Sequence, residues 1–428
     1  MRVERIGQWR FAGVGFVLMS ISVAADDDIF NMSIEQLLQV KISGSTLIEQ
    51  DVKRTPSAVT VFSREQIRRL GVQYVEELMN LVPGFQRYRG SGHGFTYGYS
   101  SRGRRITEGS GEILILIDGM QIHNPRSGYN ANFHSRIPVA SVERVEFIRG
   151  PGSALYGSNA MMGVVNIITT RFHNEARVSG GNFEQGAIDV LSAGAAGELT
   201  YDLFLHHQQD EGDEFLVRDA FNRVPVATSD PRTTGSAMIK LNWRDTHLSL
   251  RHHDNRSEDF YVLSNLANDF NVYHNWLNQV ALTHDMVLGP LQSELTYFHN
   301  ADVSKIDAQL LPPGALARIS SPPSGDPYRA HATLASREDR LRWHNYWSLE
   351  SGTLVFGVDL RRVQNTTADS VTKFDGLDVF NRRRPIRYYG EYVSVTPVEN
   401  LTHRDNIAAY GQFRLYENSS GCPLDMRV

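Results

Sequence analysis

From Leu199 onwards, apolar residues alternate with polar residues in repeated segments. In the first segment Leu199, Tyr201, Leu203 and Leu205 share one face, and Thr200, Asp202, Phe204 and His206 share the other. Later segments place on one face Ile239, Leu241 and Trp243; Leu291, Ser293, Leu295 and Tyr297; Leu354, Phe356, Val358 and Leu360; and Ile407, Ala409, Gly411, Phe413 and Leu415. This period of two, in segments of about ten residues, predicts antiparallel strands with one apolar face.

The polar stretches between these segments predict loops. One of them, Ala301 to Arg337, is rich in Asp, Ser and Pro, and its length suits an extracellular loop of a membrane barrel. A soluble β-sandwich produces the same alternation, so the strands alone leave both folds open.

The chain before this region mixes strand and helix patterns. Ala58 to Phe62 predicts a strand, and Ser63 with Gln66 forms a capping box at the start of a helix that Gly71 can end. A second helix fits Tyr74 to Leu81 and stops at Pro83-Gly84.

A short apolar run follows in the same region. Ile113 to Ile117 is apolar without alternation, so it predicts a strand that is buried on both faces. Asp118-Gly119 then predicts a turn. Together these elements indicate a compact α+β domain.

The N-terminus has the pattern of an export signal. Arg2, Arg5 and Arg10 precede an apolar run from Phe11 to Val23, and small residues follow up to Ala25, where we expect cleavage. The run is shorter than the ~20 residues that a bilayer requires, and no other apolar run in the chain reaches that length. A helical membrane protein is therefore excluded, which leaves a soluble protein or a barrel.

Composition and motifs exclude several other classes. A net charge of −5 over 428 residues argues against a nucleic-acid partner, and the single cysteine, Cys422, excludes an intrachain disulfide and a thiolate metal cluster. Gly150, Gly152 and Gly157 do not have dinucleotide-binding spacing, and neither H-E-x-x-H nor G-x-S-x-G occurs. We therefore expect no enzyme.

Four motifs in the α+β region carry a family resemblance. Residues 137–160 read IPVASVERVEFIRGPGSALYGSNA and continue as MMGVVNIITT, and upstream lie Leu81-Val82-Pro83-Gly84, Ser101-Arg102-Gly103 and Ile115-Leu116-Ile117-Asp118-Gly119. In this order and spacing the motifs resemble the plug of TonB-dependent outer-membrane receptors.

The resemblance implies the fold class: an α+β plug domain followed by antiparallel transmembrane β-barrel strands. Residues 1–25 would be the signal peptide, residues 26–45 a periplasmic N-terminal segment, residues 46–172 the plug domain and residues 173–428 a partial barrel.

We expect this barrel to be incomplete. A plug of about 125 residues has a radius of gyration near 14 Å. A wall of about a dozen strands, which residues 173–428 supply at roughly 20 residues per strand, has a radius of only about 12 Å, whereas plugged lumens belong to transporters of about 22 strands. The ending, Gly421 to Val428, also breaks the alternation. A frameshift, a split gene and a truncated reading frame all fit, and such a chain would not transport by itself.

The resemblance also implies a function at the cell outer membrane. Such receptors take up a scarce nutrient, such as an iron-siderophore, haem or cobalamin, with energy from the TonB protein of an inner-membrane complex. Val40, Lys41, Ile42 and Ser43 are the best candidates for the segment that adds as a strand to that partner. A ligand-sensing signalling receptor is the alternative, but only Asp26 to Ser45 precede the plug, which favours transport.

Two plug loops are expected to contact a small-molecule ligand, most simply a metal chelate. The candidate residues are Arg87, Tyr88, Arg89, His93, Phe95, Tyr97 and Tyr99 in the first loop, and Asn124, Arg126 and Tyr129 in the second. His93, His123 and His134 could together bind metal, but 15 histidines are spread along the chain, so we expect no metal site and no cofactor.

Three further plug residues match a tether that, in the family, joins plug arginines to carboxylates of the barrel wall. They are Arg102, Glu146 and Arg149. Buried charges require partners, so barrel carboxylates are expected near the two arginines. Salt bridges within the plug are the alternative.

Overall fold

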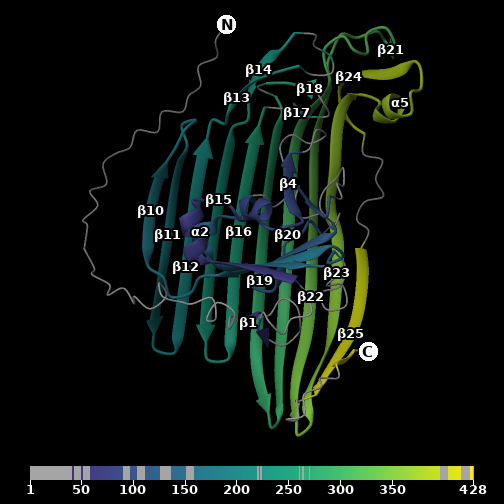
Figure 1. Ribbon diagram of the computed structural model, residues 1–428. Coiled ribbons are helices and arrows are strands. Elements are labelled where there is room, and N and C mark those ends of the chain that lie inside the picture. Colours follow the sequence, from purple (N-terminus) through teal and green to yellow (C-terminus); the bar gives the residue numbers. More distant parts are fainter. Residues whose placement is uncertain are drawn as a thin grey trace.

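The computed structural model describes residues 41–42, 50–51, 58–89, 97–103, 111–125, 136–150, 159–218, 221, 224–259, 261–262, 265–268, 270–395, 403–415 and 425–427. A small α+β unit, here called the plug, lies against the concave face of a large curved sheet, here called the wall (Figure 1). No helix in the described residues is both long and apolar enough to cross a membrane. The expected signal peptide lies outside the described residues.

The plug is built on a five-stranded sheet. In spatial order its strands are β3 (Ala58–Ser63), β8 (Val142–Arg149), β9 (Gly163–Thr169), β6 (Ile113–Ile117) and β7 (Met120–Gln121). Only β6 and β9 pair in parallel. The predicted strands at residues 58–62 and 113–117 are thereby confirmed.

The helices also follow their sequence signals. Helix α2 (Arg64–Leu70) begins at the predicted capping box, in which Gln66 N donates to Ser63 Oγ at 3.3 Å and Ser63 N donates to Gln66 Oε1 at 3.0 Å. Gly71 ends the helix with a φ of 68°. The second predicted helix is shorter, because α3 (Val75–Leu78) tightens into the 3-10 helix η3 (Met79–Leu81) before Pro83.

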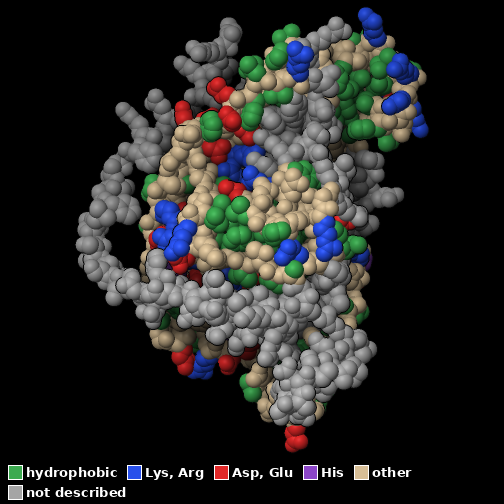
Figure 2. Space-filling view, in the orientation of Figure 1, with side chains coloured by type: hydrophobic (Ala, Val, Ile, Leu, Met, Phe, Trp, Pro, Cys, Tyr) green, Lys and Arg blue, Asp and Glu red, His purple; other side chains and the backbone are tan. Residues whose placement is uncertain are grey.

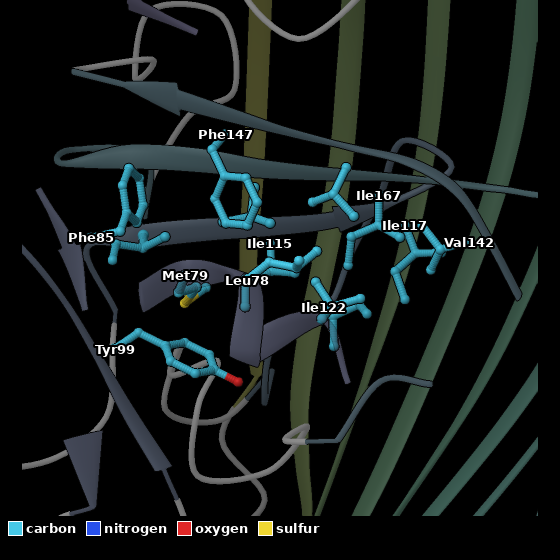
Figure 3. Close-up of a cluster of buried hydrophobic side chains, with 14 of the residues drawn as sticks. Leu78, Met79, Phe85, Tyr99, Ile115, Ile117, Ile122, Val142, Phe147 and Ile167 are labelled. Carbon is cyan, nitrogen blue, oxygen red and sulfur yellow. The ribbon is translucent and has the colours of Figure 1, made fainter. Parts of the chain in front are cut away.

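The plug core lies between this sheet and the helices (Figure 3). Alternate residues of β6 contribute to two separate apolar clusters, which is why the whole strand is apolar. A Cβ on Gly163 would lie 2.6 Å from Cζ of Phe85 and 2.8 Å from the carbonyl oxygen of Ile148, so this strand position accepts only glycine. The labelled core residues are Leu78, Met79, Phe85, Tyr99, Ile115, Ile117, Ile122, Val142, Phe147 and Ile167.

Four short hairpins accompany these two sheets. They are β1 (Lys41–Ile42) with β2 (Gln50–Asp51), β4 (Phe85–Arg89) with β5 (Tyr97–Ser101), β13 (Glu214–Val217) with β14 (Val226–Ser229), and β17 (Tyr261–Val262) with β18 (Asn265–Leu266).

The wall is one sheet of 13 strands, which pair antiparallel except for the short β21 beside β24. Its strands are β10 (Glu175–Gly180), β11 (Gly186–Ala196), β12 (Leu199–Asp210), β15 (Arg232–Trp243), β16 (Thr246–Glu258), β19 (Val272–Leu288), β20 (Leu291–Leu311), β21 (Ser320–Ser321), β22 (Tyr328–Leu349), β23 (Gly352–Phe374), β24 (Ile386–Ser394), β25 (His403–Leu415) and β26 (Asp425–Arg427).

The connections of the wall differ between its two ends. At one end tight turns join β11 to β12 and β19 to β20, with Gly197 and Gly289 at positive φ. At the other end the connections are long and carry β13, β14, β17, β18 and the helix α5 (Gly376–Phe380). Outer-membrane barrels have short periplasmic turns and long extracellular loops, so the second end is the extracellular one.

The alternation along the wall strands is confirmed. On β12, Asp202, Phe204 and His206 are buried toward the plug, and Leu199 and Leu205 are exposed on the outer face.

The loop prediction for residues 301–337 was wrong, since β20 continues to Leu311 and β22 begins at Tyr328. Asp302 and Ser304 are polar because they face the plug, and only residues 312–327 form the connection between the two strands.

In the described residues the wall begins at β10 and branches after β23, with one branch ending at β21 and the other at β26, and β10 pairs with neither. The expectation that the barrel is incomplete stays a prediction.

Candidate functional site

The plug contacts the wall chiefly through a ribbon formed by residues Asp118–Asn124. Asp118 and Gly119 have φ values of 49° and 78°, which turn the chain between β6 and β7 as predicted. The ribbon then leaves the plug sheet, and its side chains and carbonyl groups meet the inward-facing residues of successive wall strands.

The first contact of the ribbon is an ionic cluster. Asp118 Oδ2 lies 2.9 Å from Nζ of Lys240 on β15 and 3.5 Å from Nη2 of Arg251 on β16. Burial by itself raises the pKa of Asp118, but the charges of Lys240 and Arg251 and the amide of Thr169 lower it below its ordinary value. The carboxylate therefore stays ionised within the interface.

The next contacts are neutral hydrogen bonds to β19 and β20. Gln279 Nε2 donates to the carbonyl of Gln121 at 3.1 Å, and Asn300 Nδ2 donates to the carbonyl of His123 at 3.4 Å. Asn124 Nδ2 donates to the carboxylate of Asp302. These bonds satisfy backbone and side-chain groups that have no access to water.

A second buried ionic group ends the ribbon. His123 Nε2 lies 3.0 Å from Oε2 of Glu338 on β22 and 2.8 Å from Nη2 of Arg361 on β23. Arg361 Nε in turn lies 2.7 Å from Oε1 of Glu338. Glu338 and Arg361 both contact Nε2 of the ring, so His123 joins the plug to the wall in this structure.

The ribbon therefore crosses β15, β16, β19, β20, β22 and β23 in chain order. Sequence reasoning missed the wall residues that hold it: Lys240, Arg251, Gln279, Asn300, Asp302, Glu338 and Arg361. Each occupies an inward position of an alternating strand, which the pattern could have revealed. Their partners depend on the strand register and could not be read from the sequence.

A second flank of the plug is formed by helix α2. Arg64 Nη2 lies 3.1 Å from Oε2 of Glu175 on β10, and Nη1 donates to the carbonyls of Ala140 and Val142 at 2.9 and 3.1 Å. Beside these bonds a crevice of about 310 Å³ separates α2 from β10, β11 and β12. His206 lines this crevice, with Nδ1 held 2.7 Å from Asp189 Oδ1.

A charged cavity lies between α3 and the wall near the extracellular end of β12. Glu76 Oε1 accepts a hydrogen bond from the amide of Arg136 at 3.0 Å and lies 3.9 Å from Nη1 of Arg87. Arg136 Nη2 lies 3.0 Å from Asp210 Oδ2, and its guanidinium covers the ring of Tyr74.

Burial dominates the electrostatics of this cavity. It raises the pKa of Glu76 to about 7, despite the nearby charge of Arg87, and it raises the pKa of Tyr74 to about 12. In the described part of the chain, Oε2 of Glu76 has no hydrogen-bond partner, which is consistent with a carboxyl that binds a proton readily.

The structure places the expected ligand residues in different surroundings. Arg87 lines the charged cavity, and Tyr88 is half-buried on β4. Arg89 and Tyr97 belong to the paired strands β4 and β5, so the first plug loop is shorter than expected. His93, Phe95, Arg126 and Tyr129, with His134, lie outside the described residues.

Two other expected ligand residues are buried. Tyr99 is 3% exposed and packs in the plug core. Asn124 is 1% exposed and donates to Asp302 of the wall. Both side chains are buried because the elements that carry them are packed within the plug or against the wall, and their role in ligand contact stays a prediction.

The three residues of the expected tether make no described contact with carboxylates of the wall. Glu146 is fully buried but accepts from Arg144 Nε at 2.8 Å and from Asn166 Nδ2 at 2.9 Å, both within the plug. In the part of the chain that the structure describes, no ion pair includes Arg102 or Arg149. The described ion pairs between plug and wall are made by Arg64, Arg68, Asp118, His123 and Arg136.

The structure describes two of the four residues, 40–43, that are expected to bind the TonB protein. Lys41 and Ile42 form β1 and pair with Gln50 and Asp51 of β2. Val40 and Ser43 lie outside the described residues. Its role in coupling stays a prediction.

Comparison with known proteins identifies the plug region. Residues 51–164 match the TonB-dependent Receptor Plug Domain. The vitamin B12 transporter BtuB of Vibrio vulnificus is 36% identical over 147 residues, which are 34% of this chain and 22% of that protein. These matches support the expected TonB-dependent outer-membrane receptor, and they assign residues 51–164 to its plug-domain family.

Solved structures share the fold across the plug and the wall together. FpvA of P. aeruginosa, bound to a ferric pyoverdine, has a TM-score of 0.62 at 14% identity, with 90% of this chain and 55% of that chain covered. The siderophore receptor PirA of Acinetobacter baumannii has a TM-score of 0.56 at 19% identity, with 85% and 55% covered. This chain thus spans little more than half the length of these receptors.

Proposed function

We propose that the protein takes up a scarce nutrient across the outer membrane with energy supplied by a TonB protein. One observation carries this proposal: ion pairs and hydrogen bonds hold the ribbon to six wall strands, beside smaller apolar contacts such as Met120 with Ala281 and Phe298. Water can replace hydrogen bonds of this kind when the plug moves, whereas apolar surfaces resist exposure. A plug that must release a ligand inward needs such an interface.

The names of similar proteins suggest a class of nutrient for this chain, which we state as a proposal. Among the similar proteins are a vitamin B12 transporter and receptors for siderophores. We infer that the ligand of this chain is a small molecule of the same general kind, an iron-siderophore, haem or cobalamin. The direct test is to purify the full-length protein from outer membranes and to determine the mass of any molecule that remains bound.

We propose that the extracellular side of the plug contacts the ligand. Arg87 is the described candidate, because it lines a charged cavity that opens beside the extracellular end of β12. The other candidates also remain part of this proposal: Tyr88, Arg89, His93, Phe95, Tyr97, Tyr99, Asn124, Arg126 and Tyr129. Arg87→Ala should weaken binding of the co-purified ligand at least tenfold, and Arg69→Ala on the exposed face of α2 should leave it unchanged.

We propose that residues 40–43 form the coupling segment for TonB. The extended conformation of Lys41 and Ile42 supports this role, since strand addition requires extended backbone. Val40→Pro or Ile42→Pro removes a backbone donor. Ligand binding to cells should persist and uptake should stop, whereas Lys41→Ala, which keeps the backbone donor, should import normally. Unchanged uptake by both proline variants would remove this segment from consideration.

We also retain two structural proposals that accompany this function. The first is the division of the chain at residues 45/46 and 172/173 into periplasmic segment, plug domain and barrel strands. The second is a tether from Arg102 and Arg149 to carboxylates of the barrel. Arg102→Ala with Arg149→Ala should speed hydrogen exchange throughout the plug if the tether exists, and should leave it unchanged if these residues pair only within the plug.

A further inference from the structure

The wall contributes a row of polar side chains to the crevice beside α2. The crevice has a volume of about 310 Å³, at the lower limit of pockets that bind small molecules. The antiparallel register places Arg177 of β10 opposite Asp189 of β11, and Asp189 opposite His206 of β12. All three side chains line the crevice, so one cross-strand row supplies it with charged and titratable groups.

Helix α2 contributes two arginines to the same crevice. Arg64 and Arg68 lie one helical turn apart, and both line the crevice. Figure 2 shows Lys and Arg side chains gathered at the position of α2. Ile67 is 1% exposed and packs in the plug core, which fixes the rotation of the helix and keeps the two arginines beside the wall.

The arginines of the crevice share one carboxylate. Glu175 Oε1 lies 2.8 Å from Nη2 of Arg177 and 3.7 Å from Nη2 of Arg68. Its other oxygen, Oε2, lies 3.1 Å from Nη2 of Arg64. Glu143 also attracts Arg64, but no ion pair joins these two in the described part of the chain. Within the described residues, Arg68 and Arg177 have no further hydrogen-bond or ion-pair partner, so most of their N–H groups can donate to a bound anion.

The imidazole of His206 adds a hydrogen-bond acceptor to these donors. Nδ1 lies 2.7 Å from Oδ1 of Asp189, and because a carboxylate only accepts, the ring proton belongs on Nδ1. Nε2 of the neutral ring then carries a lone pair. In the part of the chain that the structure describes, Nε2 has no hydrogen-bond partner, although the side chain is only 5% exposed. Buried polar atoms are nearly always paired, so this nitrogen is suited to accept from a ligand in the crevice.

We propose that the crevice binds the hydrogen phosphate ion. Its oxygens accept from Arg68 and Arg177, in the paired geometry that guanidinium groups form with phosphate, and its P–OH group donates to Nε2 of His206. Inorganic phosphate keeps a proton near pH 7, whereas sulfate keeps none and would bring a lone pair against the lone pair of Nε2. The site therefore selects phosphate over sulfate, although the two ions have the same shape.

Phosphate in the crevice connects the plug to two strands of the wall. Arg68 belongs to α2, Arg177 to β10 and His206 to β12. An ion that binds these three residues together stabilises the arrangement in which α2 lies against the wall. At a phosphate concentration ten times the dissociation constant, separation of α2 from the wall should become about tenfold rarer. This inference goes beyond the proposed uptake of a nutrient and does not depend on it.

The first test measures the binding of inorganic phosphate to the full-length receptor in detergent at pH 7. Phosphorus NMR line broadening gives the affinity, and competition by sulfate at constant ionic strength gives the selectivity. The wild type should bind phosphate at least tenfold more tightly than sulfate. This comparison requires no substitution, and equal affinity for the two ions overturns the proposal.

A phosphomonoester identifies the source of the phosphate group. Glycerol phosphate has largely lost its last proton at pH 7, so it should bind as weakly as sulfate. Tight binding of glycerol phosphate would overturn the assignment of the crevice to the free ion.

Three variants separate the contributions of charge and imidazole. Arg68→Gln/Arg177→Gln should weaken phosphate binding at least tenfold. His206→Gln should still bind phosphate but lose the preference over sulfate, because an amide can donate to either ion. The matched control is Arg69→Gln on the same helix, because Arg69 pairs with Glu65 and does not line the crevice, so this variant should bind as the wild type does. Unchanged binding by the double variant, or an equal loss in Arg69→Gln, contradicts the proposed site.

Hydrogen exchange locates the bound ion. Phosphate at ten times its dissociation constant should slow exchange in residues 64–70 about tenfold and leave residues 120–125 unchanged. Sulfate at the same concentration should have no such effect. If phosphate binds while exchange in residues 64–70 stays as fast as before, the ion binds elsewhere and the proposal is wrong.

Discussion

The plug meets the wall along two flanks that differ in burial. Along residues Asp118–Asn124 the contacts are ionic at both ends and distributed over six consecutive strands, and the pair of His123 with Glu338 is fully enclosed. Along α2 and α3 the ion pairs of Arg64 and Arg136 lie beside a crevice and an open cavity. Solvent can enter the second flank without moving the first.

This difference in burial predicts that the ribbon is a fixed edge of the plug and that the flank of α2 and α3 can separate from the wall. Breaking an enclosed ion pair leaves a buried charge without a partner, whereas water compensates a pair that is partly exposed. We therefore expect the ribbon to stay on the wall while the helical flank loosens. The following predictions measure this contrast as unfolding free energies, with urea or thermal denaturation followed by tryptophan fluorescence.

The largest effect is expected at the end of the ribbon. Glu338→Ala leaves Arg361 and His123 without their buried carboxylate, so the folded protein should lose about 3 to 5 kcal/mol. The matched control is Asp339→Ala, the next residue on β22, which is partly exposed and should cost no more than about 1 kcal/mol. Equal losses in the two variants would show that burial at Glu338 is not what matters.

The second largest loss of unfolding free energy is expected for Asp118→Ala. It removes the carboxylate that Lys240 and Arg251 share, and we expect a loss of about 3 to 4 kcal/mol. Lys240→Met in the same chain should recover part of that loss, because one unpaired charge is removed as well. A double-mutant cycle measures the coupling, and additive effects would contradict a direct interaction.

The contribution of Glu76 to the pH dependence of stability tests the flank formed by α2 and α3. Its carboxyl has a pKa of about 7 in the folded plug and an ordinary value of 4.5 in the unfolded chain, so the folded state binds more protons between these values. Stability should fall as pH rises through that window. Glu76→Gln should remove this slope and stabilise the plug by about 2 to 3 kcal/mol at pH 8, with little change near pH 4. A variant that is less stable than the wild type at pH 8 would show that Glu76 is held ionised.

The smallest effect is expected for Arg64→Ala, about 1 kcal/mol, because solvent beside the crevice replaces part of its pairing with Glu175. Hydrogen exchange should rise in α2 and remain slow at residues 120–125. If Arg64→Ala destabilises as strongly as Glu338→Ala, the two flanks are equivalent and the proposed fixed edge does not exist.

Local patterns in the sequence were sufficient for much of the fold. The capping box at Ser63 and Gln66, the apolar run of β6 and the alternation of β12 depend on neighbours within one turn or one strand, and the structure has each of them. Motif order likewise indicated the family to which the plug belongs. These features are encoded by short-range geometry, which a sequence displays directly.

The partners across the interface were decided only by the tertiary structure. Asp302 and Ser304 look like loop residues until the register of β20 turns them toward the plug, and Tyr99 resembles a loop aromatic until β5 carries it into the core. Likewise, His123 meets Glu338 and Arg361 across more than two hundred residues of chain. Within the segments that it marked as strands, the sequence determined which residues face inward, because side-chain direction follows from strand period. Which of them touch depends on how the plug is seated within the wall, and no local pattern contains that information.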